Sequence, residues 1–283
     1  MLVASRSILA FCDHKVGNPE SESGRIPTTF PTRGESVYIH PTALPNFIKK
    51  YLPRIQFPFV LVSGDSDMTI PTDCQHSATI ILNHPLLIEW YAQNCVSPSG
   101  KLKQLPIGLD FHTLARGHHQ WGPRQSVQSQ EEDIAKIRAN SPHDKKLLCY
   151  ANFQFLMNTR YGADRRQAMS EIPSNLVYYE PHTVPRIQSW QTMSQYKFVI
   201  SPHGNGLDCH RTWEALALGC IPIVKSGPLD PMFFGLPVLI VKEWNEVTAD
   251  LLTTWSPTNT SLDKLMLSYW DKLINKHNDV VSN

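Results

Sequence analysis

The residues best suited to chemistry lie between positions 198 and 225, in the segment FVISPHGNGLDCHRTWEALALGCIPIVK. Its pattern predicts a short buried strand, a glycine loop, a helix over about 209–218 and a second strand. The loop residues are His203, Gly204, Asn205 and Gly206. A glycine loop that ends at a helix N-terminus suits a phosphate, because unpaired N–H groups and the helix dipole both point at it. The glycines would also permit positive φ angles.

Arg211 and Glu214 are placed one turn apart on the predicted helix, so their side chains can share one face. Arginine suits a diphosphate, and glutamate suits the paired hydroxyls of a ribose. The simpler alternative is an ordinary ion pair on a solvated helix face. Asp208 would cap the helix at its start, and Gly219 would end it. Taken with the glycine loop, this segment favours a sugar-nucleotide site and therefore a glycosyltransferase.

Three segments resemble the pattern of exostosin-like glycosyltransferases, including the small versions found in large DNA viruses of algae. They are FVLVSGDSD at 59–67, LPIGLDFHTL at 105–114 and SPHGNGLDCHRTWEALALGCIPIV at 201–224. The resemblance implies an α/β, GT-B-like fold, in which two Rossmann-like domains face each other across a cleft. It also implies a nucleotide-sugar donor in the C-terminal domain, inversion at the anomeric carbon, and no cofactor or obligatory metal. A UDP-sugar, with xylose as the sugar, is the expected donor.

The predicted domains are an acceptor-binding domain over 1–130 and a nucleotide-sugar domain over 131–283, with a last helix that can pack back on the first domain. Ser7–Cys12 reads as a first strand, and Leu105–Leu109 reads as a later one. Ligands of open α/β sheets bind beyond the carboxyl ends of their strands, so residues that follow strands are the natural site candidates.

An inverting transferase needs a base that takes the proton from the acceptor hydroxyl. Asp65, Asp67 and Asp73 follow a strongly predicted strand, Phe57–Ser63, and are the favoured candidates. Each could instead cap a turn or a helix, as aspartates often do. The rival candidates, Asp110 and His112, follow the predicted strand at 105–109.

Further donor-binding residues are expected at the start of the second domain. Asn152 ends a predicted strand, LLCYAN, and Arg160, Arg165 and Arg166 follow it. Arginine beside a glycine loop would balance the charge of the leaving diphosphate. The alternative is a surface helix with basic residues.

The composition argues against several classes of protein. Charged residues make up 18% of the chain, hydrophobic residues make up 41%, and the net charge is +1. These values are typical of a globular protein and give no electrostatic reason to expect nucleic acid or a membrane surface. No apolar run approaches the length of a membrane span. The six cysteines form no C-x-x-C pair, so a zinc site is not expected, and scattered thiols favour the cytoplasm. The adjacent His118-His119 pair also lacks the ligand spacing of a metal site.

The expected partners are therefore a UDP-sugar and a glycan acceptor. Two other functions stay open. A NAD-dependent nucleotide-sugar epimerase or dehydrogenase would carry G-x-G-x-x-G after its first strand, and residues 12–24 lack that motif. A non-catalytic module that binds a nucleotide or glycan would resemble the enzyme closely in sequence.

Overall fold

The computed structural model describes residues 1–17, 24–117 and 119–277, and it divides into two compact units. The N unit comprises Val3–Ile107 and the chain from Met266 onward. The C unit comprises Met1–Leu2 and Gly108–Leu265. The division thus falls between Ile107 and Gly108, whereas the sequence prediction placed it after residue 130. Each unit is described by itself.

The N unit contains a parallel sheet in the order β1-β2-β3-β4. Its helices and strands are α1 (Ser5–Phe11), β1 (Ser36–Tyr38), α2 (Leu44–Asn46), β2 (Phe59–Ser63), α3 (Gln75–Leu82), β3 (Leu87–Ala92), β4 (Leu102–Gln104) and α11 (Leu267–Ile274). Every residue of β2 is buried, as expected for a parallel strand covered on both faces.

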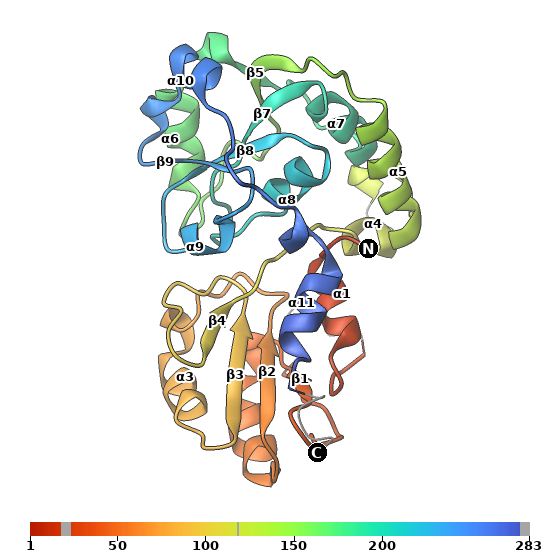
Figure 1. The fold of residues 1–283 in the computed structure, drawn as a ribbon, viewed down its shortest axis with the longest axis vertical. Helices are drawn as coiled ribbons and strands as arrows, with labels where there is room; N and C mark the ends of the chain where they lie inside the picture. Colours follow the sequence, from red (N-terminus) through yellow and green to blue (C-terminus); the bar gives the residue numbers. More distant parts are fainter. Residues whose placement is uncertain (18–23, 118, 278–283) are drawn as a thin grey trace. The chain divides into compact units, whose positions relative to one another are not determined.

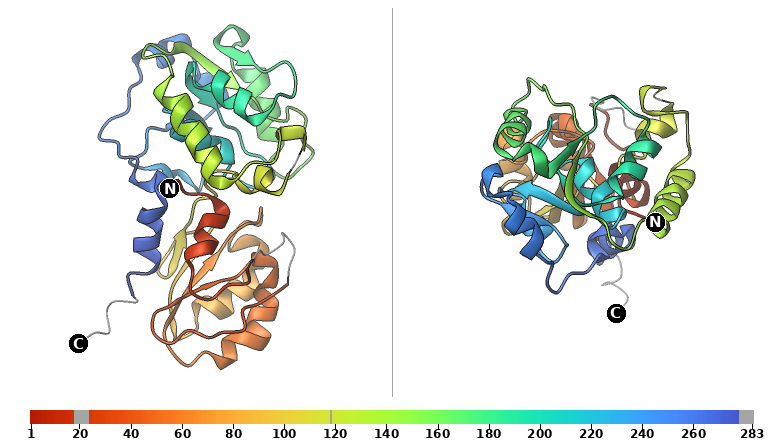
Figure 2. Two further views of the ribbon diagram at one scale, coloured as in Figure 1. Left: turned by 90° about the vertical axis from the view of Figure 1, so that its right-hand side faces the viewer. Right: turned by 90° about the horizontal axis from the view of Figure 1, so that it is seen from above.

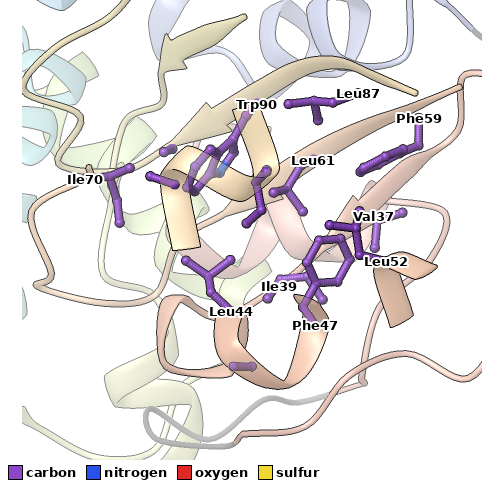
Figure 3. Close-up of a cluster of buried hydrophobic side chains, with 14 of the residues drawn as sticks. Val37, Ile39, Leu44, Phe47, Leu52, Phe59, Leu61, Ile70, Leu87 and Trp90 are labelled. Atoms are coloured by element: carbon purple, nitrogen blue, oxygen red, sulfur yellow. The ribbon is translucent and has the colours of Figure 1, made fainter. Parts of the chain in front are cut away.

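One face of this sheet packs against α2, the turns that follow it and α3. Phe47 and Leu44 meet Phe59, Leu61 and Trp90 in one apolar cluster (Figure 3). The other face is covered by α1 and α11, which lie side by side although they come from opposite ends of the sequence (Figures 1 and 2).

Polar contacts also join α11 and its following turn to this sheet. Tyr91 Oη on β3 donates to Leu273 O at 3.3 Å, and Lys276 Nζ pairs with Glu89 Oε2 at 2.8 Å. The last helix therefore completes the second face of the N-terminal sheet.

Two sequence predictions were wrong in this unit. The predicted strand Ser7–Cys12 is helix α1, where Ser7 Oγ accepts from Ala4 N and donates to Ala4 O. Such short apolar runs do not separate helix from strand by periodicity. The predicted strand Leu105–Leu109 is irregular, because β4 ends at Gln104 and Pro106 has no N–H for a strand ladder.

The C unit contains a five-stranded parallel sheet in the order β6-β5-β7-β8-β9. Its strands are β5 (Lys146–Ala151), β6 (Val177–Tyr179), β7 (Tyr196–Ile200), β8 (Ile221–Lys225) and β9 (Leu239–Val241). Its helices are α4 (His112–Arg116), α5 (Val127–Ala139), α6 (Ala163–Glu171), α7 (Arg186–Met193), α8 (His210–Ala217), α9 (Asp230–Phe233) and α10 (Ala249–Thr254). The expected α/β class, with two Rossmann-like parallel sheets, is confirmed.

The strand order of the C unit reverses between β5 and β7. From β5 the chain moves to β6 on one side and then returns to β7 on the other. In doubly wound sheets the carboxyl ends of the strands at such a reversal are the usual ligand site.

The central segment folds as the sequence predicted, as strand β7, loop, helix α8 and strand β8. Gly219 follows the helix with a φ of +70°, as a C′ glycine does. The expected cap differs, since Cys209 is the N-cap residue and provides no side-chain cap. Asp208 instead accepts from Trp213 Nε1 at 2.9 Å.

Among the described residues, every helix falls short of the length and apolarity needed to cross a bilayer.

Gly219→Ala should destabilise the C unit by about 1 kcal/mol, because only glycine adopts this left-handed conformation without steric cost. Gly227→Ala is the control, since Gly227 lacks a positive φ and an added Cβ would meet only Lys225 O at 4.0 Å. Urea unfolding of both variants tests this. Equal stability of the two variants would contradict the expectation.

Candidate functional site

The C-terminal ends of β5 and β7 carry the polar residues that the sequence singled out. Asn152 follows β5 directly, and the loop from Ser201 to Cys209 joins β7 to α8. Ser201 Oγ lies 2.8 Å from Thr212 Oγ1, which ties the start of this loop to the helix. The loop therefore lies at the point where the strand order reverses.

Arg165 enters this site from α6. Its side chain is buried, and the whole residue is only 7% exposed. Nε donates to His203 O at 2.9 Å, and Nη1 donates to Gln154 O at 3.0 Å. Burial lowers the pKa of Arg165, and the nearby Cys209 and Asp164 partly oppose this shift.

Arg211 enters from the first turn of α8. Its Nε donates to Asn152 O at 3.0 Å, while its Nη1 is buried and has no hydrogen-bond partner among the described residues. Burial lowers the pKa of Arg211 to about 10, and the charge of Arg165 adds to this shift. Arg211 remains charged at neutral pH, although its surroundings disfavour the charged form.

Both guanidinium groups lie over the ring of Phe153. The Cζ atoms of Arg165 and Arg211 are 5.7 Å and 5.1 Å from its centroid. Such stacking offsets part of the cost of burying a cation. No ion pair with a carboxylate is recorded for either arginine among the described residues. Within the described parts of the chain neither guanidinium is paired directly with a carboxylate, so an anion with several oxygens, such as a diphosphate, could bind to both.

Gly204 shows why the loop needs a glycine. A Cβ on Gly204 would lie 2.7 Å from Arg165 Nη2, so any larger residue would displace the guanidinium. The expectation of a positive φ was wrong for both loop glycines, because neither Gly204 nor Gly206 adopts one. The glycine allows an internal arginine to approach the backbone.

Asp164 holds the same loop in place, and sequence analysis missed it. Its Oδ2 accepts from His203 N at 2.8 Å, and its Oδ1 accepts from Trp244 Nε1 at 2.7 Å. The residue is buried beside Arg165. Its only sequence signal was an acidic residue in the basic run Asp164-Arg165-Arg166, which resembles a surface helix.

The other predicted donor-binding residues lie farther out. Asn205 and Arg160 are exposed, and the Arg160 guanidinium stacks over Tyr161 at 5.1 Å. The Tyr161 ring in turn meets the edge of His203, with centroids 6.3 Å apart. His203 Nδ1 lies 2.9 Å from Leu207 O, so its imidazole stabilises the loop.

Glu214 lies on α8, three residues after Arg211. Its charge raises the pKa of Arg186 and opposes the fall in the pKa of Arg211. Glu214 is half-buried, and no hydrogen bond to its carboxylate is recorded within the described parts of the chain. Its oxygens are therefore available to accept from a ligand.

A second polar cluster, in the same unit, contains the two rival base candidates. Asp110 Oδ1 lies 3.1 Å from His112 Nδ1, and Asp110 Oδ2 accepts from Arg186 Nη2 at 2.7 Å. Arg186 Nη1 also donates to Asp110 O. His210 Nδ1 lies 2.7 Å from Gly108 O, and its ring centroid is 6.0 Å from that of His112.

Burial alone would raise the pKa of Asp110. The positive charges of His210, Arg186 and His112 outweigh it and hold the pKa of this carboxyl well below its usual range. These contacts therefore favour the ionised form of Asp110.

The three favoured aspartates belong to the N unit and differ from one another. Asp65 has a φ of +59°, and its Oδ2 lies 3.0 Å from Arg6 Nη2. Asp73 is exposed, and its Oδ2 accepts from Thr69 N at 2.8 Å, which closes a turn. Asp67 is exposed. Of these three aspartates, Asp65 is therefore the one with both a left-handed backbone conformation and an ion pair to an arginine.

No group of three or more histidine, cysteine, aspartate or glutamate side chains is arranged to hold a metal ion in residues 1–17, 24–117 and 119–277.

Comparison with known proteins adds a likeness in fold. No protein-family model and no curated protein match this sequence. Five chains of solved structures do match. One is an α,α-trehalose-phosphate synthase (UDP-forming) from Burkholderia vietnamiensis, with 11% identity, a TM-score of 0.40, and coverage of 87% of this chain and 71% of that chain.

Arg211→Met should abolish most anion binding without lowering stability. The fall in the pKa of Arg211 from 12.5 to about 10 corresponds to roughly 3 kcal/mol in favour of the neutral form, a cost that the charged form bears at neutral pH. We expect affinity for pyrophosphate and UDP to fall at least about tenfold, the effect of one lost charge-assisted contact. Calorimetric titration and thermal melting test this.

The control is Arg138→Met, because exposed Arg138 also donates to a backbone carbonyl, Ala217 O, at 3.3 Å. This variant should bind as wild type does. Unchanged anion affinity in Arg211→Met, with a lower Tm, would show that Arg211 serves the fold alone.

Proposed function

We propose that this protein is a glycosyltransferase that moves one sugar from a nucleotide-sugar donor to a hydroxyl of a glycan acceptor. The observation that carries the proposal is the pair of guanidinium groups on Phe153, at the reversal point of the sheet, which are in direct contact with no carboxylate among the residues that the structure describes. A donor diphosphate would lie against Arg211, Arg165 and the start of α8. Two Rossmann-like units in one chain agree with the GT-B-like fold that the resemblance implies.

Departure of the nucleoside diphosphate is the step these arginines would assist. As the bond from the anomeric carbon to the diphosphate oxygen breaks, negative charge grows on that oxygen. Guanidinium groups already held by backbone carbonyls can stabilise this charge without reorganising. Such a site needs no bound metal for this task. In-line attack from the opposite face of the sugar would invert the anomeric centre.

Glu214 is proposed to accept from the ribose hydroxyls, because its carboxylate lies on the helix face next to Arg211. A nicotinamide dinucleotide fits the unit less well. The turn after β5 begins Asn152-Phe153-Gln154-Phe155, where a dinucleotide fold has its glycines. The Phe153 ring at this turn lies against the guanidinium groups of both arginines.

The resemblance to exostosin-like enzymes supports UDP-xylose as the donor within this proposal. It also supports a small enzyme that forms a single linkage. The six free cysteines agree with a reducing compartment such as the cytoplasm.

Thermal melting against UDP, UDP-xylose, UDP-glucose, GDP-mannose and NAD, each with and without EDTA, tests the donor class. We expect UDP and at least one UDP-sugar to raise the Tm, with the same shift in EDTA, because arginines carry the diphosphate. Stabilisation by NAD alone, or by none of the five, would overturn the proposal.

Glu214→Gln should weaken UDP binding about tenfold, because an amide accepts hydroxyl hydrogen bonds less strongly than a carboxylate. Pyrophosphate affinity should stay within about twofold of wild type or rise, since pyrophosphate has no ribose. Glu132→Gln, which changes an exposed glutamate of α5, is the matched control. If Glu214→Gln loses affinity for UDP and for pyrophosphate to the same extent, Glu214 supports the fold or the electrostatics of the diphosphate site and does not bind the ribose.

A further inference from the structure

We propose that His112, held by Asp110, is the general base that takes the proton from the acceptor hydroxyl. This inference rests on the proposed transferase function and deepens it. The sequence left five candidate bases, and the contacts within the C unit favour this one.

Asp110 fixes the orientation of the imidazole. Its Oδ1 lies 3.1 Å from His112 Nδ1 and also accepts from Thr113 N at 3.1 Å. An ionised carboxylate can only accept, so His112 Nδ1 carries the proton and Nε2 carries the lone pair. This is the arrangement in which a carboxylate orients a catalytic histidine.

Arg186 keeps the carboxylate ionised and prevents it from turning. It donates to Asp110 through both Nη atoms, to the side chain at 2.7 Å and also to the backbone carbonyl. Asp110 is therefore a positioning residue and a poor base itself. The His112 side chain is 24% exposed and Asp110 is 10% exposed, so only the imidazole can readily meet a substrate.

The dyad lies beside the proposed donor site within one compact unit. The His112 ring is 6.0 Å from that of His210, the first residue of α8, and Arg211 is the second. The charge of Glu214 acts both on Arg186, which binds Asp110, and on Arg211.

His112 Nε2 takes the proton of the acceptor hydroxyl, and the oxygen lone pair forms a bond to the anomeric carbon. The bond from that carbon to the diphosphate oxygen breaks, and its electron pair leaves with the nucleoside diphosphate. Asp110 stabilises the imidazolium, while Arg165 and Arg211 stabilise the leaving group.

Two of the candidate aspartates of the N unit have structural contacts. Asp73 closes a turn by accepting from Thr69 N, and Asp65 Oδ2 lies 3.0 Å from Arg6 Nη2. Asp65→Asn therefore belongs in the test, as the rival base.

The experiment measures UDP release from UDP-xylose and UDP-glucose, with water or added monosaccharides as acceptor, alongside UDP affinity. We expect His112→Asn to lower kcat by 10²-fold or more, in the range of general-base effects, with UDP affinity within about twofold of wild type. The acid limb of the pH–rate profile, where the base becomes protonated, should disappear. Added imidazole should partly restore His112→Gly, because a free base can replace the missing ring.

Asp110→Asn provides a second variant in which the imidazole remains but its orientation is lost. We expect kcat to fall and KM for the donor to change little. His143→Asn is the control, because exposed His143 also contacts an aspartate, with Nδ1 3.2 Å from Asp144 Oδ1. This variant should match wild type.

Retention of kcat within about threefold in His112→Asn would overturn the inference, as would loss of turnover in Asp65→Asn alone. If His112→Asn lost kcat and UDP affinity equally, and imidazole gave no rescue, the Asp110–His112 pair would have a structural role. That result would also overturn the inference. Failure of wild type to bind UDP or release it from either donor is a different result, since it removes the transferase proposal itself.

Discussion

The C unit depends on how two arginines, one buried and one half-buried, are held. Arg165 and Arg211 donate to backbone carbonyls of His203, Gln154 and Asn152, which are neutral acceptors. Carbonyls fix the direction of a guanidinium without cancelling its charge, whereas a carboxylate would do both. The surrounding residues then follow from this arrangement. Phe153 lies beneath both cations, Gly204 leaves room for one of them, and Asp164 holds the loop that provides a carbonyl.

A third arginine of the same unit, Arg186, differs because it binds a carboxylate. Arg186 is bound to Asp110 through side chain and backbone, and the charges of Glu214 and Asp110 raise its pKa, although burial opposes this. The positive charge of Arg186 is balanced by Asp110 within the protein. Arg186 can therefore orient Asp110, but it is poorly suited to bind an anionic ligand. Residue type alone did not separate these roles. The nature of the acceptor, carbonyl or carboxylate, separates them.

Much of the fold was readable from sequence because it rests on local patterns. The strand–loop–helix–strand segment around 198–225 and its closing Gly219 were predicted from an apolar run, glycines and spacing. Predictions failed where partners distant in sequence decide the outcome. The run at 7–12 is apolar in either conformation, and its packing against α11 selects a helix. Asp164 appeared as part of a surface helix, since its partners, His203 N and Trp244, lie 39 and 80 positions away.

The path of the chain through the two units has a consequence for biosynthesis. The last helix, α11, covers one face of a sheet whose strands end by residue 104, while residues 108–265 form the other unit in between. As the polypeptide leaves the ribosome, the inserted unit has all its strands before the N-terminal sheet receives its final helix. During that interval, apolar residues that α11 later covers are exposed to solvent or to a chaperone. The nascent N-terminal sheet, synthesised first, is therefore completed last.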